Sequence, residues 1–154
     1  MRIRIDDRGA SPIEFALAVG FLLIPTAVLV MSIAPWVERQ SLARVAAGEA
    51  ARVLVLSQGS TPDEGAAYGV VLQIASNHGV DQGDVSVFFC APESASDVIK
   101  AASHCPTLER GAIVDVEVRV RVPAATVLGI GTFGEATVSS RVSEQVELFR
   151  SFAP

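Results

Sequence analysis

The stretch that decides the fold is residues 15–37, FALAVGFLLIPTAVLVMSIAPWV, a run of 23 residues without a charge. As an α-helix this run is about 34 Å long, close to the roughly 30 Å hydrocarbon core of a bilayer. A globular helix of this length carries a polar face, and this run has none. It is therefore predicted to be either a membrane-spanning helix or the apolar part of a secretory signal peptide.

The signal-peptide alternative requires a cleavage site after the run. Ser32, Ile33 and Ala34 place small residues at the two positions that such a cut inspects. However, Pro35 would follow the cut directly, and the run is long for a segment that is removed. A retained helix is therefore favoured.

Charge is distributed unevenly about this run. Arg2, Arg4 and Arg8 precede it together with two Asp residues, whereas the whole chain has a formal charge of −5. Basic residues beside a membrane span are typically retained in the cytoplasm, so the remainder of the chain is predicted to lie outside. The twelve Lys and Arg residues are scattered, and phosphate binding requires them to be clustered, so no nucleic-acid partner is predicted.

Helical periodicity continues beyond the apolar run. Apolar residues recur there at spacings of three and four, which predicts one buried face made of Leu42, Val45, Ala46, Ala50, Val53 and Leu56. Glu49 falls within this face, where it could pair with Arg52 or serve as a contact site. After a break at residues 57–60 a second helix is predicted, with Thr61 as N-cap, Pro62 at the first position and Glu64 completing a capping box. Its predicted buried face is Ala67, Tyr68, Val71, Ile74 and Ala75, and Gly79 is its predicted stop.

The rest of the chain has the period-two pattern of β-strands. Residues 85–90 form a short predicted strand, and residues 114–122 alternate strictly between Val and charged side chains. Residues 137–149 alternate more loosely, with Val138, Val142, Val146 and Leu148 expected to point inward. The predicted fold class is α+β. A long membrane-spanning helix at residues 10–57 continues into a domain at residues 58–154, in which a second helix packs on an antiparallel sheet of three or more strands.

An apolar segment rich in glycine, PAATVLGIGTFGE at residues 123–135, separates the last two strands and is predicted to be a loop. Its large apolar residues, Val127, Leu128, Ile130 and Phe133, are unusual on a free surface. They are either core residues of an irregular turn, which is the commoner outcome, or a contact patch for a partner or the membrane.

Cys90 and Cys105 are the only cysteines, and both lie in the part predicted to be outside the cytoplasm. A small, even number of cysteines in an oxidising compartment suggests one disulfide, and the alternative is two reduced, buried thiols. A short helical insert at residues 95–103 would allow the two ends to meet.

Residue types with catalytic or metal-binding chemistry are few. The spacing of His78 and His104 to the two cysteines does not match a zinc finger. The glycines of residues 129–134 come without a Lys and without a following helix, so they do not form a phosphate-binding loop. The sequence predicts no catalytic residue, no metal site and no cofactor, and therefore a protein that is not an enzyme.

The residues before the apolar run carry the functional signal. Residues 8–15, RGASPIEF, resemble the type IV prepilin processing site, in which a membrane peptidase cuts after a Gly and a Glu occupies the fifth position of the mature chain. The short polar leader, the Gly, the Glu-Phe pair and the long apolar helix resemble more particularly the TadE/TadF-like minor pilins of tight-adherence (Flp) pilus systems. This likeness covers roughly residues 8–56.

The resemblance implies a leader at residues 1–9, cleavage between Gly9 and Ala10, and assembly roles for Glu14 and Phe15. The implied partners are a prepilin peptidase, the major Flp pilin and other minor pilins, the inner-membrane assembly platform and membrane lipid. The implied location is the bacterial cytoplasmic membrane, spanned once, with the domain outside or carried in a pilus. An accessory protein that stays in the membrane is the alternative.

Two roles are open for Glu14. A lone carboxylate at the membrane end of an apolar helix is costly without a partner, and the new amine of Ala10 or of a neighbouring subunit could neutralise it. Alternatively, Ser11 and Glu14 form a capping box around Pro12, and Glu14 then caps the helix.

Overall fold

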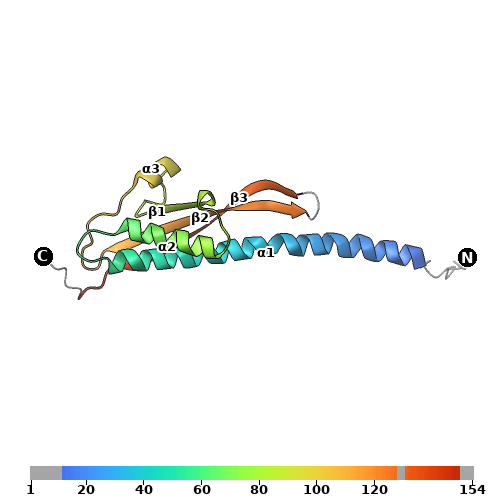
Figure 1. The fold of residues 1–154 in the computed structure, drawn as a ribbon, viewed down its shortest axis with the longest axis horizontal. Coiled ribbons are helices and arrows are strands. Elements are labelled where there is room, and N and C mark those ends of the chain that lie inside the picture. Colours follow the sequence, from blue (N-terminus) through green and yellow to red (C-terminus); the bar gives the residue numbers. More distant parts are fainter. Residues whose placement is uncertain (1–11, 128–130, 150–154) are drawn as a thin grey trace, which may run out of the picture.

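The structure, a computed structural model, describes residues 12–127 and 131–149 (Figure 1). Its elements are α1 (Pro12–Leu56), α2 (Glu64–Asn77), the 3₁₀ helix η1 (Gln82–Asp84), β1 (Val85–Phe89), α3 (Asp97–Ala102), β2 (Ile113–Val127) and β3 (Gly131–Gln145). Figure 1 shows the N-terminal part of α1 projecting beyond the other described elements at one end of a small domain. The predicted α+β class is confirmed, because a long apolar helix runs into a domain of a helix and a three-stranded antiparallel sheet.

Helix α1 runs unbroken through both Pro25 and Pro35. Its C-terminal half forms the centre of the domain core, where it packs against β2, β3 and α2. The buried face is built mainly from alanine, which favours the helix and lets it approach the sheet closely. It consists of Leu42, Ala43, Ala46, Ala47, Ala50, Ala51, Leu54 and Val55.

The predicted buried face of α1 is partly wrong. Val45 is 52% exposed and Leu56 is 64% exposed, although Leu42, Ala46 and Ala50 are buried as predicted. The buried stripe is centred on adjacent pairs such as Ala46 and Ala47, so Val45 and Leu56 fall on the opposite side. Glu49 shares that exposed side, and its carboxylate lies 3.6 Å from the Arg52 guanidinium.

Helix α2 starts with a different cap from the predicted one. The carboxylate of Asp63, not Thr61, accepts a hydrogen bond of 2.8 Å from the backbone N–H of Ala66. Glu64 is the first helical residue, and its side chain contacts another part of the chain. The predicted stop is confirmed, since α2 ends at Asn77 and Gly79 has a φ of 63°. Ala67, Val71 and Ala75 are buried, but Tyr68 is exposed.

The sheet order is β1-β2-β3, with both pairs antiparallel. Val118 of β2 lies opposite Val87 of β1, and Val116 lies opposite Val142 of β3. All five valines of residues 114–122 are buried, as predicted from their alternation. Val138 of β3 and Val146, which directly follows the strand, are buried, whereas Leu148 is exposed, since β3 ends at Gln145.

The segment at residues 123–135, predicted to be a loop, is mostly a β-hairpin. β2 continues to Val127 and β3 begins at Gly131, with Pro123 opposite Glu135. Leu128 and Ile130 lie outside the described residues. The pairing of β1 with β2 stops at Val120, so beyond it the described part of β2 pairs only with β3. Pro123 is tolerated there because an edge position does not need a second ladder of backbone donors.

Candidate functional site

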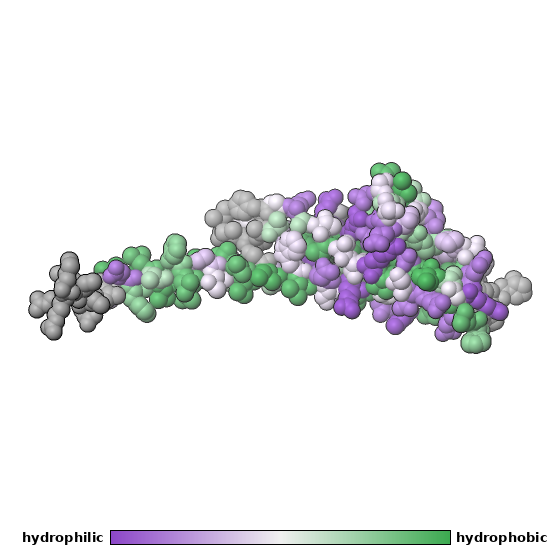
Figure 2. Space-filling model, turned by 180° about the vertical axis from the view of Figure 1, so that it is seen from behind, coloured by the Kyte–Doolittle hydropathy of each residue, from purple (hydrophilic) through white to green (hydrophobic). Residues whose placement is uncertain are grey.

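The projecting half of α1 is the first candidate functional element. Within the described residues, α1 is the one helix long and apolar enough to cross a membrane, and none of its most apolar window is buried. Figure 2 shows apolar residues over this projecting half, and polar residues over much of the domain. The large exposed side chains include Phe21, Leu22, Leu23, Ile24 and Leu29. Burying such a surface in lipid is favourable, and leaving it in water is not.

The two predicted assembly residues lie in the first turn of this helix. Glu14 is the acidic residue of that turn and is exposed, and Phe15 beside it is 67% exposed. Pro12 is the first helical residue, where the missing N–H of proline costs nothing. Gly9 and Ala10, the predicted cleavage pair, and Ser11, the predicted cap, lie outside the described residues.

A disulfide closes the second candidate element, the disulfide arm, defined as residues 91–104. Cys90 and Cys105 are bonded, with their Cα atoms 4.9 Å apart, so the first of the two alternatives for the cysteines holds. The predicted helical insert is α3, whose N-cap is Ser96. β1 ends at Phe89, one residue earlier than predicted. The next residue, Cys90, has a φ of 50°, and this backbone conformation turns the chain into the arm.

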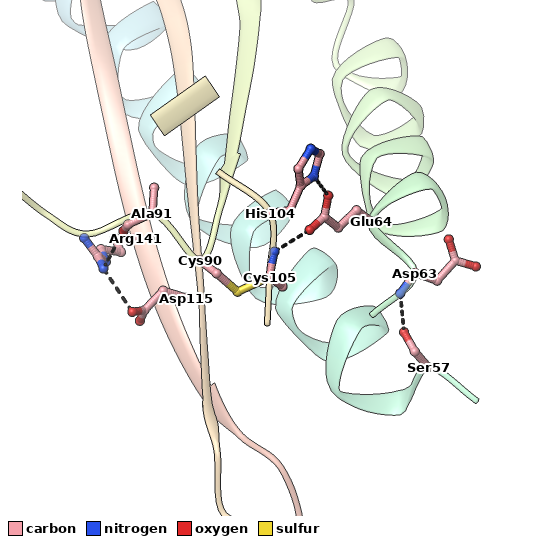
Figure 3. Close-up of a disulfide and its surroundings, with 9 residues drawn as sticks. All are labelled: Ser57, Asp63, Glu64, Cys90, Ala91, His104, Cys105, Asp115 and Arg141. Atoms are coloured by element: carbon pink, nitrogen blue, oxygen red, sulfur yellow. Dashed lines mark hydrogen bonds and ion pairs between the residues drawn. A yellow bond between two sulfur atoms is a disulfide. The ribbon is translucent and has the colours of Figure 1, made fainter. Parts of the chain in front are cut away.

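The disulfide arm is tied to the start of α2 by one carboxylate. Glu64 Oε1 accepts a hydrogen bond of 2.6 Å from the backbone N–H of Cys105, and Glu64 Oε2 lies 2.7 Å from His104 Nδ1 (Figure 3). The backbone N–H of Leu108 also donates to the Ser60 carbonyl at 2.6 Å. These contacts fix the arm beside α2 rather than leaving it as a free loop.

An ion-pair cluster, which sequence reasoning missed, joins α3 to the outer face of the sheet. Lys100 Nζ lies 3.1 Å from Glu117 Oε2, and Arg119 Nε lies 2.6 Å from Glu117 Oε1. Arg119 also pairs with Asp97 at 2.6 Å and lies 4.9 Å above the Phe88 ring. Burial by itself would raise the pKa of Glu117, but hydrogen bonds from Arg119 and Lys100 outweigh burial and hold this pKa below its usual 4.5. The alternating charged residues of β2 showed in the sequence that this face of the strand is polar. They did not show that Lys100 and Asp97 of α3 are the partners.

A second pair connects β2, β3 and the disulfide arm. Arg141 donates to Asp115 Oδ2 at 3.0 Å and to the Ala91 carbonyl at 3.1 Å, and Ser143 donates to Asp115 Oδ1. Burial tends to raise the pKa of Asp115, but the hydrogen bonds from Ser143 and Arg141 hold it below its usual 3.8. Like the cluster above, this pair holds secondary-structure elements together.

The described residues contain no group of three or more His, Cys, Asp or Glu placed to hold a metal ion. His78, the C-cap of α2, lies 3.8 Å from Glu38 of α1. His104 contacts Glu64, the first residue of α2. The two histidines therefore lie at opposite ends of that helix, and both cysteines are bonded to each other.

A scan against protein-family models, a search of curated proteins and a search of solved structures each gave no match for this chain. The architecture itself is pilin-like: an apolar N-terminal helix precedes a small antiparallel sheet domain that carries a disulfide. A disulfide is typical of an oxidising compartment, which suggests that the domain lies outside the cytoplasm.

Proposed function

We propose that this chain is a minor pilin or pseudopilin of a tight-adherence (Flp) type IV-like pilus, with a structural rather than a catalytic role in pilus assembly. The observation that carries the proposal is the form of α1. One continuous helix has an exposed apolar half and a second half that is the core of a disulfide-bonded domain. Such a helix can be held in a bilayer first and then bury the same apolar surface against neighbouring helices in a filament.

Glu14 supplies the specificity in this proposal. A prepilin peptidase cuts between Gly9 and Ala10, and the new amine of Ala10, or that of the next subunit, neutralises the Glu14 carboxylate. The pair is formed only when helices meet in the correct register, since a misplaced helix leaves a carboxylate unpaired in an apolar surrounding. Phe15 beside it is exposed and available for packing between helices.

The proposed partners are the peptidase, the major Flp pilin, other minor pilins and the inner-membrane assembly platform. Before assembly the chain spans the cytoplasmic membrane once, with residues 1–9 inside and the sheet domain outside. Protease added to intact protoplasts should then digest the domain. Protection of the domain in a correctly inserted chain would reverse the topology.

The experiment that tests the proposal combines N-terminal sequencing with the Glu14→Gln variant. We expect the mature chain to begin at Ala10 and the wild type to be found in purified pili. Glu14→Gln should still be cleaved and folded but should be lost from pili, because glutamine can cap a helix but cannot neutralise an amine. The control is Glu49→Gln on the exposed side of the same helix, which should enter pili normally.

Two outcomes would contradict the proposal. A mature chain that starts at Met1 and never enters pili would identify a membrane-anchored accessory protein. Normal incorporation of Glu14→Gln would show that the charge is dispensable and that Glu14 only caps the helix.

A further inference from the structure

An open groove lies between α1 and β3 where the projecting half of α1 meets the domain. We call it the stalk groove, and its lining residues are Trp36, Val37, Gln40, Ser41, Arg44 and Val138. Gln40 Nε2 donates to the Ser139 carbonyl at 3.3 Å, which holds β3 against the helix at this level. The groove is therefore formed by two elements that are hydrogen-bonded to each other.

The lining changes from apolar to polar along the helix axis. Trp36 and Val37, the last two residues of the uncharged run, lie at the end nearer the projecting half, and Arg44 lies at the other end. The rise between Trp36 and Arg44 is about 12 Å. Side chains of an α-helix tilt toward its N-terminus, so the side chains of Trp36 and Arg44 both lean toward the projecting half and keep about this separation.

The length of α1 places this groove at a membrane boundary. From Phe15 to Trp36 the helix rises about 32 Å, and the hydrocarbon core of a bilayer is about 30 Å thick. When Phe15 lies at the cytoplasmic boundary, Trp36 and Val37 therefore lie at the outer boundary. Arg44 then lies on the headgroup side, and tryptophan is enriched at this depth in membrane proteins.

The β2–β3 hairpin continues toward the same membrane surface. β3 runs in the same direction as α1, because Ser139 contacts Gln40 while Glu144 and Glu147 line a hollow with Arg52 and Leu56. From Ser139 back to Gly131 the strand covers about 26 Å toward the free end of the hairpin, whereas Gln40 and Trp36 are only about 6 Å apart along α1 (Figure 1). The hairpin therefore passes the level of Trp36 and enters the outer leaflet with residues 123–127 and 131–134, which carry no charge. The groove thus opens toward the bilayer between two elements that both continue in that direction.

From this arrangement we infer that the stalk groove binds an anionic phospholipid of the outer leaflet. Trp36, Val37 and Val138 contact the upper part of an acyl chain, while Arg44 and the Ser41 hydroxyl bind the phosphate. A guanidinium forms charge-assisted hydrogen bonds with phosphate. The apolar end of the groove faces the bilayer and its charged end faces the headgroups, which is also how the acyl chain and the phosphate of a phospholipid are arranged. This inference rests on membrane insertion of α1 and not on the proposed role in a pilus.

The experiment uses Trp36, the only tryptophan of the chain, as a fluorescent reporter. The full-length protein is placed in nanodiscs of phosphatidylcholine that contain a small fraction of nitroxide-labelled lipid. Two label depths are compared, near the glycerol backbone and near the acyl-chain end, and two headgroups, phosphatidylglycerol and phosphatidylcholine. We expect the shallow label to quench Trp36 more strongly than the deep one, and labelled phosphatidylglycerol to be enriched about fivefold over labelled phosphatidylcholine at low salt.

Arg44→Gln should reduce this enrichment to about onefold while leaving the depth profile unchanged. The matched control is Arg52→Gln, two turns further along α1 and paired with Glu49, which should keep the fivefold enrichment. Equal quenching by the two headgroups in the wild type would overturn the inference, as would an Arg44→Gln variant that keeps its enrichment. Strongest quenching by the deep label, or none by any label, would place lipid elsewhere and leave the groove to a protein partner or to water. Because no pilus is needed, this test can fail while the proposed function stands.

Discussion

The backbone N–H of Cys105 donates a hydrogen bond of 2.6 Å to Glu64 Oε1, although 41 residues separate the two positions. Figure 3 shows the Glu64 carboxylate reaching from the first turn of α2 to both His104 and Cys105. The disulfide links the same point to Cys90 at the end of β1. One carboxylate and one disulfide therefore connect α2, the disulfide arm and the sheet.

Glu64→Ala should lower the free energy of unfolding by about 1–3 kcal/mol, because it leaves the partly buried N–H of Cys105 without its acceptor. The measurement is urea unfolding of the full-length protein in detergent micelles. Glu93→Ala, at an exposed position in the same arm, is the control and should be nearly silent. Equal stability of the two variants would show that the contact adds nothing.

Replacement of both Cys90 and Cys105 by serine should cost about 3 kcal/mol, the value expected in the chain-entropy model for a loop of about 15 residues. The same unfolding assay measures it. Mass spectrometry of the non-reduced wild type should show no thiol that can be alkylated. Two alkylated thiols in the non-reduced wild type would contradict the disulfide.

Ala46→Leu should destabilise the domain by about 1–3 kcal/mol, because Ala46 is fully buried between α1 and the rest of the core. Val45→Leu is the matched control one residue earlier. Its side chain is 52% exposed, and we expect a change within about 0.5 kcal/mol. Thermal unfolding of both variants compares them, and a larger loss in Val45→Leu would mean that α1 is rotated differently about its axis.

Stability should fall as the pH is lowered below about 4.5. The pKa values of Glu117 and Asp115 are held below their usual 4.5 and 3.8 in the folded domain. At a pH between the folded-state and unfolded-state pKa values, the unfolded chain binds more protons than the folded domain. The contribution of these two carboxylates to the free energy of unfolding is therefore complete at neutral pH and is lost as the pH falls through their folded-state pKa values. Unfolding measured from pH 6 to about pH 3 should show a shallower loss in Glu117→Gln than in Glu93→Gln. If the two variants lose stability with falling pH at the same rate, Glu117 does not contribute to the pH dependence.

Local patterns predicted the elements of this fold well where each pattern had one physical cause. The strict alternation of residues 114–122 arises because one face of β2 is buried, and all five valines of those residues are buried in the structure. Gly79 ends α2 because its φ of 63° suits glycine. The helical insert between the cysteines was likewise predicted and is α3.

The predictions were wrong where contacts between residues far apart in the chain determine the structure. The glycines of residues 123–135 argued for a loop, yet β2 and β3 continue as a hairpin. Pro123 is accepted there because the pairing of β1 stops at Val120 and leaves an edge. Glu64 suited a capping box, but its carboxylate binds Cys105 and His104, and Asp63 takes the cap. Neither partner could be identified from spacing along the chain.

By itself, the sequence determined the apolar helix, the sheet strands and the resemblance carried by Glu14, because these depend on hydropathy, periodicity and neighbouring residues. Only the tertiary structure decided which side of α1 is buried, how far the hairpin extends, and that Trp36, Arg44 and Val138 line one groove. A helix with apolar residues on several sides can be buried in more than one rotation. The sheet against which it packs fixes that rotation, and the sheet is formed by residues far away in the chain.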